Sequence, residues 1–197
     1  MKKVVIAVLL TMLSVGSVLA QTDTLALDDN NKIIYYQVVT QPASPADTLY
    51  NKVTLFLKKA YPKDRLKLVK LDKANSTLSA TGGVLVSKKS MIAMHEDASV
   101  GFNFVIEVKD NKYRYWFTDF VVTPYERDRY ANFVPVAGKS YPIEKASGKL
   151  STDDYNGYLK KIVANCREIG VILKSYTNNK PIAVKQTQKK TAVPKEW

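Results

Sequence analysis

Few residues of this chain could carry catalytic chemistry. The 197 residues contain one histidine, His95, and one cysteine, Cys166. A nucleophile needs a base beside it and a metal ion needs several ligands, and neither residue has a suitable neighbour at a recognised spacing. Carboxylate chemistry remains, and Glu107 and Asp119 lie on neighbouring predicted strands, although the pattern leaves open whether they share a face. We therefore expect no catalytic, metal or cofactor site, with a carboxylate-based hydrolase as the weaker alternative.

Aromatic and cationic side chains give a stronger signal for binding. Tyrosine, tryptophan and arginine often carry the binding energy of protein surfaces. Seven candidate binding residues have this character: Tyr113, Arg114, Tyr115, Trp116, Arg127, Arg129 and Tyr130. The alternative for the first four is a central strand packed on both faces. The alternative for the last three is a flap over the sheet edge, formed by the long irregular segment 124–149.

A predicted β-hairpin from Gly101 to Thr123 would position the first four residues. Its first arm alternates apolar and polar residues, which is typical of a sheet covered on one face. Asp110-Asn111 favours a tight turn between the arms. Strict alternation divides the second arm into Tyr113, Tyr115, Phe117 and Asp119 on one face and Arg114, Trp116, Thr118 and Phe120 on the other. Aromatic side chains are thus expected on both faces of this arm.

Further strands are predicted from β-branched and aromatic runs over residues 32–39, 66–71 and 76–87. Gly82-Gly83 in the third run suggests a bulge or a bend. Residues 88–99 are expected to form a connecting loop, on which His95 is exposed.

Two amphipathic helices flank these strands. The first is predicted to begin at Ser44, with Asp47 completing a capping box, and to end before Pro62. The second is predicted to begin at Ser151, again with an aspartate, Asp154, three residues later. Cys166 lies within the apolar stripe of the second helix, so we expect this thiol to be buried as a small apolar side chain.

The N-terminal residues and the net charge predict a location. Lys2 and Lys3, an apolar run and small residues before Gln21 are typical of a signal peptide over residues 1–20, cleaved between Ala20 and Gln21. No later stretch is long and apolar enough to span a bilayer. The chain carries a formal charge of +12, which favours anionic surfaces. We expect a periplasmic or secreted protein with a flexible leader over residues 21–31, a domain over 32–176 and a disordered basic tail over 177–197.

The order strand, helix, four strands, helix predicts an α+β, β-α-β-β-β-β-α fold, with both helices on one face of a mostly antiparallel curved sheet. The segments KIIYYQVV (32–39), DTLYNKVTLFLKKAY (47–61) and YRYWFTDF (113–120) resemble a family of secreted bacterial proteins, common in Bacteroidota, that is catalogued as a domain of unknown function. The resemblance spans residues 31–174 and implies one repeat of the TATA-box-binding-protein (TBP) fold. It implies no activity, and a shared fold does not imply DNA binding.

These features favour a non-catalytic, exported binding or interaction module of the cell envelope. Its partner would be an anionic envelope glycan or another envelope protein, and export makes nucleic acid a poor candidate. The alternative from another class is a carrier of small apolar ligands, with a cavity lined by Phe102, Phe104 and Phe117. The oligomeric state and the identity of the ligand do not follow from the sequence.

Overall fold

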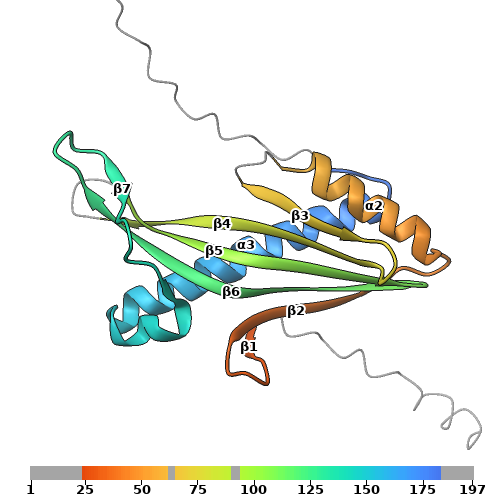
Figure 1. Cartoon of the computed structure of the whole chain (residues 1–197), viewed down its shortest axis with the longest axis horizontal. Coiled ribbons are helices and arrows are strands. Elements are labelled where there is room, and N and C mark those ends of the chain that lie inside the picture. Colours follow the sequence, from red (N-terminus) through yellow and green to blue (C-terminus); the bar gives the residue numbers. More distant parts are fainter. Residues whose placement is uncertain (1–23, 62–64, 90–93, 183–197) are drawn as a thin grey trace, which may run out of the picture.

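The fold has two layers, an antiparallel sheet and two helices packed on one of its faces (Figure 1). The computed structural model describes residues 24–61, 65–89 and 94–182. The predicted signal peptide lies outside these ranges, as do residues 183–197 of the predicted basic tail. The strands are β1 (Leu25–Leu27), β2 (Ile33–Thr40), β3 (Leu66–Asp72), β4 (Thr77–Lys89), β5 (Met94–Lys109), β6 (Lys112–Arg127), β7 (Phe133–Pro135) and β8 (Tyr141–Pro142). The helices are α2 (Ala46–Lys59), the 3-10 helix η2 (Ile143–Gly148) and α3 (Thr152–Thr177).

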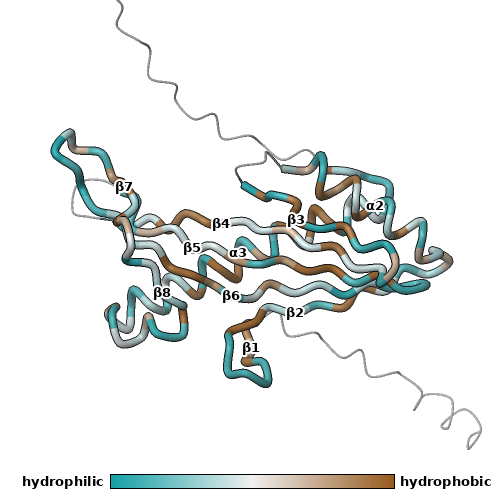
Figure 2. Tube along the Cα trace, viewed as in Figure 1, coloured by the Kyte–Doolittle hydropathy of each residue, from teal (hydrophilic) through white to brown (hydrophobic). Residues whose placement is uncertain are grey.

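The predicted topology is confirmed. The strand order is β1-β2-β6-β5-β4-β3, and β7 and β8 also pair with β6. Each of these strand pairs is antiparallel. Hydrophobic residues concentrate along the middle of the long strands, whereas the turn between β5 and β6 is hydrophilic (Figure 2).

Aromatic rings fill the space between the sheet and the helices. Phe104 of β5 stacks on Phe117 of β6 with 4.3 Å between ring centroids, and Phe56 of α2 meets Phe104 edge-on at 6.5 Å. Phe102 packs edge-on against Phe117 at 5.3 Å. All four rings are buried, so the cavity proposed for an apolar ligand is occupied by the three phenylalanines expected to line it.

A β-bulge in β6 corrects the expected division of its faces. Asn103 pairs with Thr118 and Gly101 with Val121, so Asp119 and Phe120 together stand opposite Phe102. Asp119 adopts a φ of 54°. The extra residue shifts the alternation by one position, which turns Phe120 into the core at 1% exposure and Asp119 to the opposite face. Trp116 is therefore the one aromatic residue of 113–120 on that face.

The capping of the first helix also differs from the prediction. The Ser44 side chain does not cap α2, whose N-cap residue is Pro45. Instead, the turn of the β5–β6 hairpin reaches the helix start: the Asp110 carboxylate accepts the Ala46 N–H at 2.8 Å, and the Asn111 side chain accepts the Ser44 N–H at 3.1 Å. The second cap is confirmed, because the Ser151 hydroxyl accepts the Asp154 N–H at 3.1 Å.

The sheet is regular at two places where the sequence suggested an interruption, the Gly82-Gly83 pair and residues 94–99. Gly82 and Gly83 pair in register with Phe102 and Gly101, and the register shift in β4 falls between Val86 and Ser87. A Cβ on Gly82 would lie 2.7 Å from the Phe102 ring, so glycine leaves room for that ring. Residues 94–99 continue β5 and are not part of a loop.

Short strands occupy segments expected to be irregular. Residues 25–27 of the expected leader pair with β2, and the Asp28 carboxylate closes the turn by accepting two backbone N–H groups. Asp128 closes the β6–β7 turn with the same pattern of contacts. Thr177, expected to begin the tail, is instead the buried last residue of α3. The segment 124–149 extends the edge of β6 through β7 and β8.

Candidate functional site

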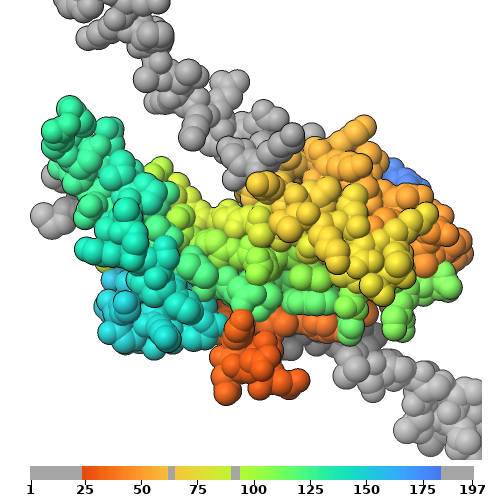
Figure 3. Space-filling model, in the orientation of Figure 1, coloured from red at the N-terminus to blue at the C-terminus, as the bar shows by residue number. Residues whose placement is uncertain are grey.

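The face of the sheet opposite the helices carries the candidate site. In the view of Figure 3, β4, β5 and β6 reach the surface and most of α3 is hidden behind them. Side chains on this outer face form rows across the strands. Tyr36 of β2 stands opposite Trp116 of β6, which stands opposite Val105 of β5. The next row contains Val38, Arg114 and Glu107 in the same order.

Arg114 is held in place on this face by charge and aromatic contacts. Its Nε donates to the Glu107 carboxylate at 2.6 Å, and its Nη2 lies 2.5 Å from the same oxygen. The guanidinium lies 5.7 Å from the centroid of the Trp116 ring. Hydrogen bonds to Glu107 and then to Tyr36 raise the pKa of Arg114. The cation is therefore fixed beside two aromatic rings.

A shallow depression of about 170 Å³ lies at this end of the outer face. It is lined by Tyr36, Val38, Glu107, Lys109, Lys112, Tyr113 and Arg114. Tyr36 is 41% exposed, and Lys109 and Lys112 are exposed at the end of the hairpin. Three cations and one carboxylate thus surround an aromatic and aliphatic floor, an arrangement suited to an anionic group attached to an apolar surface.

The structure divides the four candidate residues of 113–116 between two faces. Arg114 and Trp116 lie on the outer face, as the binding hypothesis requires. The side chains of Tyr113 and Tyr115 are buried beneath α3, so the binding hypothesis is wrong for these two residues and the packed alternative holds for them. The Tyr113 hydroxyl lies 3.3 Å from the Thr177 hydroxyl, and the Tyr115 ring packs against Gly170. Alternation along β6 directs both tyrosines to the helices.

The remaining candidates, Arg127, Arg129 and Tyr130, lie at the β6–β7 turn and are exposed. The Arg129 guanidinium lies 4.8 Å from the Tyr130 ring centroid, and Tyr130 is 70% exposed. Arg114 and Arg127 stand near opposite ends of β6, separated by about 40 Å of extended chain. The seven candidates therefore do not form one site.

Sequence reasoning missed four residues of the depression: Tyr36, Val38, Lys109 and Lys112. The turn at Asp110-Asn111 fixes the hairpin register, so Lys109 opposite Lys112 could have been found from the sequence. Tyr36 and Val38 could not, because they reach the site only through the pairing of β2 with β6, which are distant in the chain.

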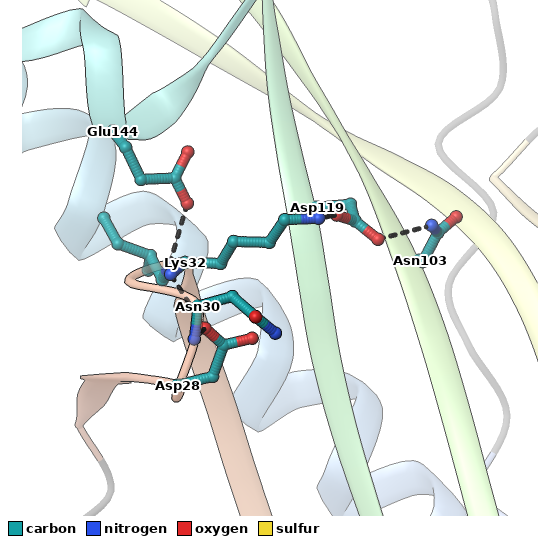
Figure 4. A network of polar contacts seen from close by, with 7 residues as sticks. Asp28, Asn30, Lys32, Asn103, Asp119 and Glu144 are labelled. Carbon is teal, nitrogen blue, oxygen red and sulfur yellow. Dashed lines mark hydrogen bonds and ion pairs between the residues drawn. The ribbon is translucent and has the colours of Figure 1, made fainter.

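Glu107 and Asp119 share the outer face but do not form a catalytic pair. Glu107 is bound to Arg114, whereas Asp119 accepts hydrogen bonds from Lys32 and, at 2.9 Å, from Asn103 (Figure 4). Asn103 and Glu107 are four residues apart on β5, about 13 Å along the strand. The Lys32 and Asn103 hydrogen bonds lower the pKa of Asp119, the opposite of what a general acid at neutral pH requires.

The other two reactive side chains, His95 and Cys166, pack against neighbouring parts of the protein. The His95 ring stacks on Phe133 of β7 with 4.8 Å between centroids, so it is not an exposed loop residue. Cys166 is buried in α3, as predicted. Within residues 24–61, 65–89 and 94–182, no three His, Cys, Asp or Glu side chains are arranged to hold a metal ion. No helix in the same ranges is both long and apolar enough to cross a membrane.

Comparisons with known proteins agree with this fold. Residues 35–123 match the model of a family described as "Domain of unknown function (DUF4468) with TBP-like fold". The structure resembles that of a TBP-like protein from Parabacteroides distasonis ATCC 8503, with 16% identity and a TM-score of 0.61, over 79% of this chain and 98% of the other. It also resembles a DUF4468 family protein from Bacteroides ovatus ATCC 8483, with 13% identity and a TM-score of 0.59, over 84% and 94% of the two chains.

At these identities the structural likeness shows the fold alone. The family match spans β2 to β6, and the likeness to the two solved structures covers a larger share of the chain. No curated protein matches the sequence.

Proposed function

Because residues 35–123 match a family described only as a domain of unknown function with a TBP-like fold, we propose the function of this chain from the chemistry of the outer face. We propose that it is an exported, non-catalytic binding module of the cell envelope that holds an anionic glycan in the depression beside Tyr36. The observation that carries this proposal is the placement of Arg114, Lys109 and Lys112 around an exposed aromatic ring.

Each part of the depression has a role in such binding. The apolar face of a sugar ring packs on Tyr36, whose ring is exposed next to Trp116. The carboxylate or sulfate of the sugar pairs with Lys109 and Lys112, and Glu107 accepts hydrogen bonds from sugar hydroxyls. An open, shallow site of this kind suits one or two residues within a long polymer. The cations attract anionic polymers at low ionic strength, so affinity should fall as salt is added.

Export is supported by the sequence of residues 1–20. Expression of the full chain in a Gram-negative host, followed by N-terminal sequencing of the recovered protein, tests this part. A protein beginning at Gln21 in the periplasmic or extracellular fraction is the expected result. An uncleaved chain that stays in the cytoplasm would remove the cell envelope as the site of action.

Titration calorimetry with a uronic-acid polysaccharide and its carboxyl-reduced form tests the ligand class. Lys112→Glu is expected to weaken binding of the acidic polymer about tenfold, because it replaces attraction by repulsion at one pair. Lys160→Glu is the matched control, since Lys160 is exposed on α3, on the other side of the sheet. Equal losses in both variants would show diffuse attraction to a basic protein instead of a site.

A second pair of variants separates the depression from the β6–β7 turn. Tyr36→Ala is expected to lower affinity, whereas Tyr130→Ala, at the other end of β6, is expected to leave it unchanged. The opposite result would assign the site to the turn. Failure of the acidic polymer to bind, together with recovery of an envelope protein that loses its affinity for Tyr36→Ala, would assign the same depression to a protein partner.

A further inference from the structure

One edge of the sheet has free backbone groups whose direction can be assigned. β2 pairs with β6 over residues 35–40 and with β1 over residues 33–35 only. The Lys32 carbonyl accepts from Asp28 on the β1 side, whereas the Gln41 N–H donates to Asn111 on the β6 side. Backbone groups of an antiparallel strand point alternately to its two neighbours. Tyr36 points the same way, but the pairing of Leu25 with Tyr35 places its N–H opposite Thr24, at the end of β1. The N–H and C=O groups of Val38 and Thr40 therefore point away from β6, along an edge that pairs with no described strand.

The two edges of the sheet differ in how well they are protected against pairing with a strand of another protein. The opposite edge strand, β3, carries Lys67 and Lys70 and has a register irregularity between Leu68 and Lys70. Charges and bulges of this kind prevent pairing with foreign strands. The free part of β2, residues 37–40, reads Gln-Val-Val-Thr, without a charge, and pairs with β6 in continuous register. This edge therefore remains competent to accept another strand.

A groove of about 440 Å³ follows the same edge on the side of the helices. Residues of β2, among them Gln37 and Val39, form one wall. Arg167, Val171 and Lys174 line the other wall from α3, and Val171 is 54% exposed. Their spacing of four and three residues places these three side chains on one helix face. The groove thus offers an apolar contact between two cations.

We propose that the free edge of β2 binds an extended acidic segment of another protein by accepting it as an additional strand. The segment hydrogen-bonds to the backbone of Val38 and Thr40. Every second side chain of the segment lies over α3, so an apolar residue contacts Val171 and acidic residues two positions away on either side lie near Arg167 and Lys174. This inference goes beyond the proposed glycan binding and does not rest on it.

Charge favours an acidic partner over a second copy of this chain. A two-fold pairing of β2 strands about Val38 would bring both α3 helices to the shared groove. The cations Arg167 and Lys174 of one copy would then lie close to those of the other copy, on chains that both carry a net positive charge. An acidic strand instead supplies the opposite charge at the same positions.

Terminally blocked peptides test the proposal by fluorescence polarisation. Glu-Thr-Val-Thr-Glu has acids and valine on one face, and Lys-Thr-Val-Thr-Lys reverses the charge. A third peptide keeps the acidic sequence but carries N-methyl groups on the residues that would pair with β2. The acidic peptide alone is expected to bind, and to slow exchange of the Val38 and Thr40 amides. Binding that survives N-methylation would overturn strand addition, and absence of binding would overturn the proposal.

Variants locate the site. Lys174→Glu is expected to weaken the acidic peptide about tenfold and to allow the lysine peptide to bind. Lys160→Glu, elsewhere on α3, is expected to change neither. Val38→Pro removes an edge N–H without removing a bond to β6, so it should abolish peptide binding while the protein stays folded, as circular dichroism can verify. If Lys174→Glu changes nothing, or if sedimentation shows β2-dependent dimers of the native chain, the acidic-partner assignment is wrong.

Discussion

Gly170 of α3 is predicted to be essential for the contact between that helix and β6. A Cβ at this position would overlap the hydroxyl oxygen of Tyr115 and lie 3.0 Å from the ring carbon that carries it. Both residues are buried, so neither the ring nor the helix can move aside freely. Gly170→Ala therefore forces α3 away from the sheet or tilts the Tyr115 ring.

The expected cost follows from two opposing effects. Overpacking a core costs about 1–3 kcal/mol, and a contact this short belongs at the upper end of that range. Alanine gains about 1 kcal/mol over glycine within a helix. The net loss of unfolding free energy is therefore about 2 kcal/mol, which lowers the Tm of a domain of this size by about 4–8 °C.

Gly157 on the same helix provides a matched control. A Cβ at Gly157 has no atom within 4 Å, so Gly157→Ala should show the helix-propensity gain alone, about 0.5–1 kcal/mol. The two substitutions are chemically identical and lie in one helix. Urea denaturation followed by circular dichroism should therefore give changes of opposite sign.

A double-mutant cycle with Tyr115→Phe tests the cause. Removing the hydroxyl leaves only the 3.0 Å approach to the ring carbon, so Gly170→Ala should cost much less when Tyr115→Phe is already in place. Tyr115→Phe alone is expected to cost about 1 kcal/mol. The reasoning is refuted if Gly170→Ala is as stable as the wild type, or if the two substitutions are merely additive.

Three further predictions concern single side chains. Hydrogen bonds from Asn75 lower the pKa of Asp72 from 3.8 to about 2, so this stabilisation is complete above pH 3.8 and lost as pH falls through about 2. Asp72→Asn should flatten the stability–pH curve in that window. Tyr158→Phe removes a 2.5 Å hydrogen bond to Asp97 and should cost about 1–2 kcal/mol by urea denaturation, and an unchanged midpoint would contradict this. The buried Cys166 should react with a water-soluble thiol reagent much faster in urea than in the native state; equal rates would show that the thiol is accessible.

The sequence determined the main elements because their signals are local. The apolar stripe and the Ser151–Asp154 cap define α3 within one stretch of chain, and the turn at Asp110-Asn111 defines the hairpin register. The order of these elements then leaves few ways to bury both helices and one face of the sheet. Arg114 and Trp116 could be placed on one face for the same reason, since alternation from the turn reaches them without interruption.

Only the tertiary structure decided the bulge in β6, the cap of α2 and the depression on the outer face. The bulge at Asp119 lies opposite Phe102 of the facing strand, and it moves Phe120 into the core. The start of α2 is capped by Asp110, 64 residues away, and the outer-face depression exists because β2 brings Tyr36 beside Trp116. These features arise from contacts between residues distant in the chain, where the side chain that satisfies a backbone group or fills a space comes from another element. Local periodicity carries no information about such partners, so it predicted the elements but not the site that they form together.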